Sequence, residues 1–148
     1  MNIGILGAGN IAGSMARTIC GMAAQGRPVT LCAVASRSQE KADAFAKAYG
    51  IPRAYGSYAA MLNDPLVELV YIATPHSHHA EQIRQCVAAG KPVLCEKSFT
   101  ANAKQAEDVL REAEAAGVYV AEAIWTRYMP ARGMIADIIA SGEIGEPR

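Results

Sequence analysis

Short apolar segments alternate along the chain with longer segments in which apolar residues recur every three or four positions. The short segments, rich in Val, Ile and Leu, predict strands, and the longer ones predict amphipathic helices with many alanines. The predicted strands are residues 2–6, 29–35, 53–55, 67–73, 92–95 and 118–121. The predicted helices are residues 11–24, 39–49, a short helix opened by Ser57, 77–89 and 102–116.

The predicted helix ends carry residues that commonly cap helices. Ser57 offers a hydroxyl to the main-chain N–H groups of a first turn. Gly50, Gly90 and Gly117 each follow a predicted helix, where glycine readily adopts the left-handed conformation that ends a helix. Because strands joined by single helices with right-handed crossovers form a mostly parallel sheet, we expect an α/β fold, a doubly wound sheet of about six strands with helices on both faces.

The composition fits one domain built around a buried sheet. Hydrophobic residues make up 51% of the 148 residues and charged residues 19%, which excludes a disordered chain. Lys and Arg together number 14, as do Asp and Glu, so the net charge gives no reason to expect a nucleic acid or membrane partner. No apolar run approaches the ~18 residues that span a bilayer, and Met1 leads directly into the first strand without a secretory signal.

Four cysteines, Cys20, Cys32, Cys86 and Cys95, lie far apart, each in an apolar stretch, and form no C-x-x-C pair. We interpret them as buried, reduced thiols, which indicates a reducing compartment and a cytoplasmic protein.

A glycine-rich turn, Gly7-Ala8-Gly9-Asn10-Ile11-Ala12, follows the first predicted strand and opens a helix. Glycine patterns alone are weak signals, but this context brings a pyrophosphate onto main-chain N–H groups and the positive end of a helix dipole. Gly7 would allow the tight turn, Gly9 the approach of phosphate, and Ala12 or Gly13 the packing of helix on strand. We expect Gly7, Gly9, Asn10 and Ile11 to contact a dinucleotide; the alternative is a tight turn without a ligand.

The second predicted strand ends without the acidic residue that usually accepts a hydrogen bond from the ribose 2′-hydroxyl of NAD. Ser36 and Arg37 stand there instead, and a guanidinium can pair bidentately with a 2′-phosphate. These residues favour NADP over NAD. Two alternatives remain: Arg37 is a solvated charge, or the site accepts both cofactors.

All three histidines fall in Thr74-Pro75-His76-Ser77-His78-His79, directly after a predicted strand. A zinc site is a poor interpretation because no further ligand follows at a suitable spacing. The carboxyl ends of parallel strands line the ligand crevice, so we expect Thr74, Pro75, His76 and His79 to face the nucleotide or pack beneath it. A purely structural turn is the alternative.

Glu96 and Lys97 follow the next strand at the same edge of the sheet. A carboxylate and an ammonium in the crevice can hold the nicotinamide ribose and polarise a substrate oxygen, which makes Lys97 the catalytic candidate. The alternative is a surface ion pair between the two side chains.

Several motifs together resemble one known family. They are Gly7 to Ala12, Tyr55-Gly56-Ser57-Tyr58, Asn63-Asp64-Pro65, Thr74-Pro75-His76, Ala89 to Lys97, and Glu122-Ala123-Ile124-Trp125-Thr126-Arg127-Tyr128-Met129-Pro130. The chain resembles the Gfo/Idh/MocA family of NAD(P)-dependent oxidoreductases, and within it the branch that contains dimeric dihydrodiol dehydrogenase and NADP-dependent D-xylose dehydrogenase.

The resemblance implies that Glu96 and Lys97 belong to the family's Glu-Lys-Pro site and that Trp125 and Arg127 border the cofactor. Ser98 replaces the proline of that motif. A cis bond before a residue other than proline costs about 2.5–4 kcal/mol, so we expect a trans Lys97–Ser98 peptide.

The resemblance also implies the organisation of the chain. Residues 1–122 would form a dinucleotide-binding Rossmann domain, and residues 123–148 a segment leading to the family's second α/β domain, which this sequence lacks. The implied reaction is hydride transfer between NADP and a secondary alcohol of a polyol, sugar or dihydrodiol in a homo-oligomer, with little turnover by this chain alone. The alternative is a non-catalytic dinucleotide-binding or redox-sensing module.

Overall fold

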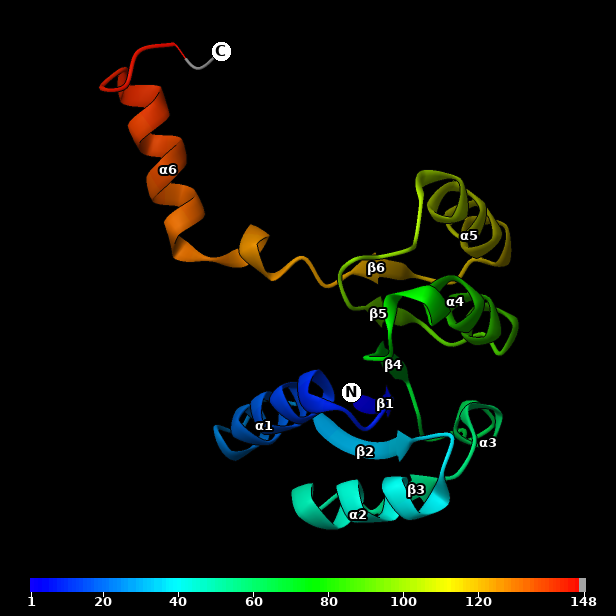
Figure 1. The fold of residues 1–148 in the computed structure, drawn as a ribbon. Helices are drawn as coiled ribbons and strands as arrows, with labels where there is room; N and C mark the ends of the chain where they lie inside the picture. The colour runs from blue at the N-terminus through cyan, green and yellow to red at the C-terminus, as the bar shows by residue number, and fades with distance from the viewer. Residues whose placement is uncertain (147–148) are drawn as a thin grey trace.

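The computed structural model describes residues 1–146 and is organised around one six-stranded sheet (Figure 1). The strands are β1 (Asn2–Leu6), β2 (Thr30–Ala35), β3 (Arg53–Tyr55), β4 (Leu69–Ile72), β5 (Val93–Cys95) and β6 (Val120–Glu122). Their order is β3-β2-β1-β4-β5-β6, and every neighbouring pair is parallel. The predicted doubly wound α/β fold is therefore confirmed, with a sheet that is wholly parallel.

Helices cover both faces of the sheet. They are α1 (Asn10–Ala24), α2 (Gln39–Tyr49), α3 (Tyr58–Leu62), α4 (His79–Ala88) and α5 (Ala103–Ala116). Buried residues of α1 and α2 pack with Ile5 and Tyr71 on one face, and those of α3, α4 and α5 pack with Val70 and Ile72 on the other. Because alternate residues of a strand point to opposite faces, β4 contributes to both clusters.

The predicted capping residues of three helices are confirmed. The Ser57 hydroxyl accepts a hydrogen bond from the N–H of Ala60. Gly50 and Gly117 end α2 and α5 in the left-handed conformation, with φ of 66° in both. The predicted start of the helix over residues 77–89 was wrong, because residues His76–His78 form a 3-10 turn, η1, and α4 begins at His79.

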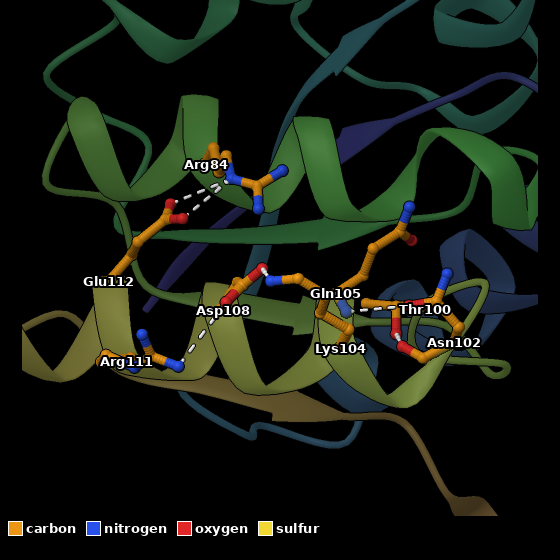
Figure 2. A network of polar contacts seen from close by, with 8 residues as sticks. All are labelled: Arg84, Thr100, Asn102, Lys104, Gln105, Asp108, Arg111 and Glu112. Atoms are coloured by element: carbon orange, nitrogen blue, oxygen red, sulfur yellow. Dashed lines mark hydrogen bonds and ion pairs between the residues drawn. The ribbon is translucent and has the colours of Figure 1, made fainter.

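Polar side chains connect α4 and α5 along their outer surface (Figure 2). Nε of Arg84 lies 3.0 Å from both carboxylate oxygens of Glu112. On α5 itself, Asp108 pairs with Lys104 and with Arg111, at 2.8 and 3.5 Å. These groups are largely exposed, so each pair contributes at most about 1 kcal/mol to stability.

The last described part of the chain stands apart from the sheet. After β6 come a 3-10 turn, η2 (Trp125–Tyr128), and the helix α6 (Pro130–Ser141), which projects away from the domain in Figure 1. No residue of α6 is buried. Four large apolar side chains of this helix are therefore exposed, those of Met134, Ile135, Ile138 and Ile139. Residues 147 and 148, the end of the predicted connecting segment, lie outside the described residues.

The cysteines follow the prediction except for one. Cys32, Cys86 and Cys95 are buried, and burial raises the pKa of the Cys86 thiol to about 12. The prediction was wrong for Cys20, which is exposed. Cys20 follows Ile19, the last buried residue of α1, and no longer lies on the buried side of the helix. Its sulfur is 3.9 Å from the carbonyl oxygen of Tyr49, the last residue of α2. Within residues 1–146, no helix has the length and apolarity needed to cross a membrane.

Candidate functional site

The segments that follow the six strands meet at one edge of the sheet and contribute to the lining of three hollows. The glycine hollow is formed by residues 7–9, Ser36, Arg37, Lys41, Tyr58 and residues 73–75. The lysine hollow is formed by Ile11, Thr74, His76, Glu96 and Lys97. The tryptophan hollow includes Met15, Leu94, Glu96, Tyr119, Trp125 and Tyr128. Thr74 is shared by the first two hollows and Glu96 by the last two, so the three form a row across the point where the strand order reverses.

At position 7, the turn after β1 has room for glycine only. Gly7 has φ of 105°, and a Cβ there would lie 2.8 Å from the carbonyl oxygen of Ala73 on the neighbouring strand segment. Gly9 is the N-cap of α1, and a Cβ at Gly9 would meet no atom within 4 Å. The turn is thus tight at Gly7 and open at Gly9, which is the arrangement that lets a phosphate approach the main chain.

The N-terminus of α1 has no side-chain cap, so no side chain competes there with a ligand for its first N–H groups. Ala12 is fully buried against β1, as expected for the residue that packs helix on strand. Gly13 serves a different contact: a Cβ there would lie 2.5 Å from the hydroxyl oxygen of Tyr49 on α2.

The wall of the glycine hollow beyond β2 is cationic. Arg37 and Lys41 both line it, together with Ser36, and none of its lining residues is acidic. Ser38 is the N-cap of α2, and its hydroxyl accepts a hydrogen bond from the N–H of Lys41. Lys41 therefore lies in the first turn of α2, close to the end of β2 where Ser36 and Arg37 lie.

The two candidate histidines have different surroundings. His76 is exposed and lines the lysine hollow, whereas His79 is fully buried beneath it. Each ring nitrogen of His79 lies 2.9 Å from a carbonyl oxygen, Nε2 from that of Thr74 and Nδ1 from that of Ser98. The ring thus connects the segment after β4 with the segment after β5. Within residues 1–146 no three His, Cys, Asp or Glu side chains are placed to hold a metal ion.

Thr74, at the junction of two hollows, is held by a buried amide. Its hydroxyl donates a hydrogen bond to Oε1 of Gln82, a residue of α4 that is only 4% exposed. A buried polar group without a partner is costly, so this pairing fixes both side chains.

Glu96 and Lys97 lie in the crevice as predicted, but not as an ion pair. Oε1 of Glu96 accepts a hydrogen bond from the hydroxyl of Tyr71, and Oε2 accepts one from the main-chain N–H of Lys97 at 3.1 Å. Among the described residues, no ion pair includes the side chain of Glu96 or of Lys97. The Lys97 side chain is exposed at the mouth of the lysine hollow.

The prediction of a trans peptide before Ser98 was wrong, because the Lys97–Ser98 peptide is cis. The cost of a cis bond given above refers to the peptide alone. In the structure the carbonyl of Ser98 faces His79, and the N–H of Phe99 donates a hydrogen bond to Oε1 of Glu122 at 3.0 Å. Both partners are distant in the sequence, so the residues next to the peptide do not reveal these contacts.

Most predicted site residues are brought together in the row of hollows. Trp125, 60% exposed, lines the tryptophan hollow. Asn10 and Arg127 line none of the three hollows, and both are exposed. The lining residues Lys41 and Tyr58 were missed by the sequence analysis. Lys41 lies six residues after the end of β2 and Tyr58 three residues after the end of β3, each in the first turn of a helix, and this placement could have indicated them.

A parallel sheet with a glycine turn at its order reversal and a cationic wall beside it defines a dinucleotide-binding α/β domain. The sequence profile of the family described as "Oxidoreductase family, NAD-binding Rossmann fold" matches residues 1–123. The chain belongs to this family, the Gfo/Idh/MocA oxidoreductases, and carries its NAD(P)-binding Rossmann domain.

Two groups of curated relatives share the chain's sequence. Trans-1,2-dihydrobenzene-1,2-diol dehydrogenase of Mus musculus is 39% identical over 145 residues, which cover 98% of this chain and 43% of the relative. D-xylose 1-dehydrogenase (NADP(+)) of Hypocrea jecorina is 39% identical over 150 residues, covering 96% of this chain and 38% of the relative. The chain therefore spans less than half the length of these relatives.

Solved structures show the same fold. A 3-ketoreductase of Actinomadura kijaniata in complex with NADP superposes with a TM-score of 0.89 at 30% identity, over 99% of this chain and 45% of that one. An NAD-binding oxidoreductase of Klebsiella pneumoniae superposes with a TM-score of 0.85 at 34% identity, over 99% of this chain and 40% of that one. The resemblance noted from the sequence motifs is thus confirmed at the level of family, fold and cofactor class.

Proposed function

We propose that the chain binds NADP or NADPH along the row of hollows and serves a dehydrogenase that acts on a secondary alcohol of a polyol, sugar or dihydrodiol. The observation that carries this proposal is the single crevice that joins the glycine turn, the cationic wall and Lys97. The names of the relatives, a dihydrodiol dehydrogenase and an NADP-dependent xylose dehydrogenase, support the substrate class.

The glycine hollow would hold the phosphates. The pyrophosphate would accept hydrogen bonds from main-chain N–H groups of the turn, at Gly7 and Gly9 and at Asn10 and Ile11 in the first turn of α1. The positive end of the helix dipole favours an anion at this point. The absence of a side-chain cap on α1 supports this role.

The cationic wall would select NADP over NAD. Arg37 and Lys41 would pair with the 2′-phosphate, and Ser36 would donate a hydrogen bond to it. No carboxylate lines this hollow to compete for the cations or to accept a hydrogen bond from a free 2′-hydroxyl. NAD remains the weaker alternative cofactor, bound without the contribution of the two cations.

The lysine hollow would hold the nicotinamide half. Thr74, Pro75 and His76 would contact the nucleotide from one side, with His79 supporting them from below. Glu96 would accept a hydrogen bond from the ribose. For Trp125 and Arg127 we propose the positions that the family resemblance implies, beside the cofactor.

The bound nicotinamide supplies the hydride chemistry, and Lys97 would move the proton. When a carbonyl is reduced, the ammonium group of Lys97 would donate a proton to the substrate oxygen; when an alcohol is oxidised, its neutral amine would accept the hydroxyl proton. The side chain is exposed at the crevice and unpaired among the described residues, so a substrate can reach it.

Three further features belong to the proposal. Residues 1–122 would be the cofactor-binding domain, and residues 123–148 would lead to a substrate-binding domain like that of the longer relatives. The exposed apolar side chains of α6 support a homo-oligomer, since such surface is usually covered. The three buried, unpaired thiols support a reducing, cytoplasmic compartment.

The experiment replaces Lys97 with alanine in the full-length gene product, with Lys104→Ala on the exposed surface of α5 as the control. We expect NADP-dependent oxidation of D-xylose or a dihydrodiol to fall at least about 100-fold in the Lys97 variant, while NADPH binds as before. The control should match the wild type in both assays. A wild-type protein that binds NADPH but oxidises none of these alcohols would instead favour the non-catalytic module.

A further inference from the structure

Tyr71 is buried in the sheet, yet its hydroxyl contacts Glu96, a residue that lines the crevice. The residue is on β4, between β1 and β5, and is 2% exposed, with its ring in the buried cluster beneath α1. The hydroxyl donates a hydrogen bond to Oε1 of Glu96. Burial raises the pKa of Tyr71, and the hydrogen bond and charge of Glu96 raise it further, so the phenol stays protonated and remains a donor.

The Glu96 carboxylate is held from two sides. Oε1 is bonded to Tyr71, Oε2 to the N–H of Lys97, and the main-chain N–H of Glu96 itself donates to the carbonyl of Ile72 at 3.0 Å. With one donor on each oxygen, the carboxylate has a single orientation and retains acceptor capacity on both oxygens. It forms part of the wall shared by the lysine and tryptophan hollows.

We infer that Tyr71 is a positioning residue whose hydroxyl fixes the Glu96 carboxylate in this wall. In this orientation the carboxylate would accept a hydrogen bond from a hydroxyl group of the nicotinamide ribose of the bound nucleotide. This inference rests on the proposed function. Tyr71 itself touches neither cofactor nor substrate, because it is buried; it acts through Glu96.

The simpler explanation is that Glu96 serves Tyr71, by accepting the hydrogen bond that a buried phenol needs. Buried tyrosine hydroxyls usually find a partner. A phenylalanine at position 71 would fill the same space without needing one, whereas the carboxylate lines the hollow where we propose that the nucleotide binds. If Glu96 only satisfied Tyr71, removing the hydroxyl would leave cofactor affinity unchanged.

The first measurement is NADPH affinity in Tyr71→Phe, Glu96→Ala and the double variant. Loss of a hydrogen bond to a charged group should weaken NADPH binding about tenfold in Tyr71→Phe. Because Tyr71 acts through Glu96, adding Tyr71→Phe to Glu96→Ala should cause no further loss. Tyr49→Phe is the matched control. The hydroxyl of Tyr49 accepts a hydrogen bond from Arg17, which connects α2 with α1, and has no contact with Glu96.

The second measurement is an infrared difference spectrum that isolates the carboxylate stretch of Glu96. Subtracting the spectrum of Glu96→Ala from that of the wild type gives this band, and the same subtraction is repeated in the Tyr71→Phe background. Loss of the tyrosine donor should shift the band. The band reports the hydrogen bond itself, and the NADPH affinities decide whether that hydrogen bond serves cofactor binding.

Each of three results would overturn the inference while leaving the proposed NADPH binding intact. They are an unshifted band, an NADPH affinity of Tyr71→Phe equal to that of the wild type, and a loss of affinity from Tyr71→Phe that is the same with and without Glu96. Failure of the wild-type protein to bind NADPH would overturn the proposed function itself, and the inference with it. The infrared band distinguishes the two cases, because it is recorded without nucleotide.

Discussion

Replacing Gly7 with alanine tests the turn on which the whole site depends. A Cβ at Gly7 would lie 2.8 Å from the carbonyl oxygen and 3.1 Å from the carbonyl carbon of Ala73. Ala73 is tied to β1 by the hydrogen bond from its N–H to the carbonyl of Leu6 at 2.8 Å. These are main-chain atoms of the residue that directly follows β4, so they cannot rotate away as the end of a flexible side chain would.

Two costs add at this position. The positive φ of 105° costs a residue with a side chain about 1–2 kcal/mol. Displacing the packed main chain of Ala73 adds at least about 1 kcal/mol, as overpacking does elsewhere. The free energy of unfolding should therefore fall by about 3 kcal/mol, which for a domain of this size lowers the melting temperature by about 6–12 °C.

Two other glycines separate these costs. Gly26 has φ of 77° but open space around its Cβ position, so Gly26→Ala should show the cost of positive φ alone. Gly21 lies within α1 with no atom within 4 Å of that position, and Gly21→Ala should raise stability by about 0.5–1 kcal/mol. Thermal unfolding should rank Gly21→Ala first, then the wild type, Gly26→Ala and Gly7→Ala. Equal stability of the Gly7 and Gly26 variants would refute the close contact with Ala73.

Two further predictions concern buried side chains. A thiol reagent at neutral pH should modify one cysteine rapidly in the folded protein, Cys20, because the other three are buried; rapid modification of a second thiol would contradict the core described above. The N–H of Leu66 holds the pKa of Asp64 below its usual 3.8, and the hydroxyl of Tyr55 and the charge of Arg53 lower it further. The stabilisation by ionised Asp64 is thus fully present above pH 3.8, the pKa in the unfolded chain, and is lost as the pH falls through the lowered pKa of the folded protein. Urea unfolding should show that Asp64→Asn destabilises the protein at neutral pH and that the difference disappears in acid; a constant difference would contradict this.

The alternation of strands and helices was predictable because it depends on local signals. Short apolar runs, apolar residues at helical spacing and capping residues such as Ser57 and Gly50 are local signals, and the elements they predict match the structure. The candidates at strand ends were also predictable, since parallel strands bring their carboxyl ends to one edge. Ser36, Thr74 and Lys97 line the hollows for this reason.

What could not be predicted depends on partners far apart in the sequence. Tyr71 appeared only as part of an apolar strand, because its contact with Glu96 requires the pairing of β4 and β5. The burial of His79 between the carbonyls of Thr74 and Ser98 requires the same pairing. The exposure of Cys20 depends on how far α2 extends over α1. Local patterns carry no information on such contacts.

The measurement that tests the central claim most directly is a calorimetric titration of the protein with NADPH and with NADH under the same conditions. The account predicts saturable binding of NADPH at one site, with NADH bound about tenfold or more weakly because it lacks the 2′-phosphate that pairs with Arg37 and Lys41. The preference should disappear when both cations are replaced by alanine. No saturable binding of either nucleotide, or tighter binding of NADH, would contradict it.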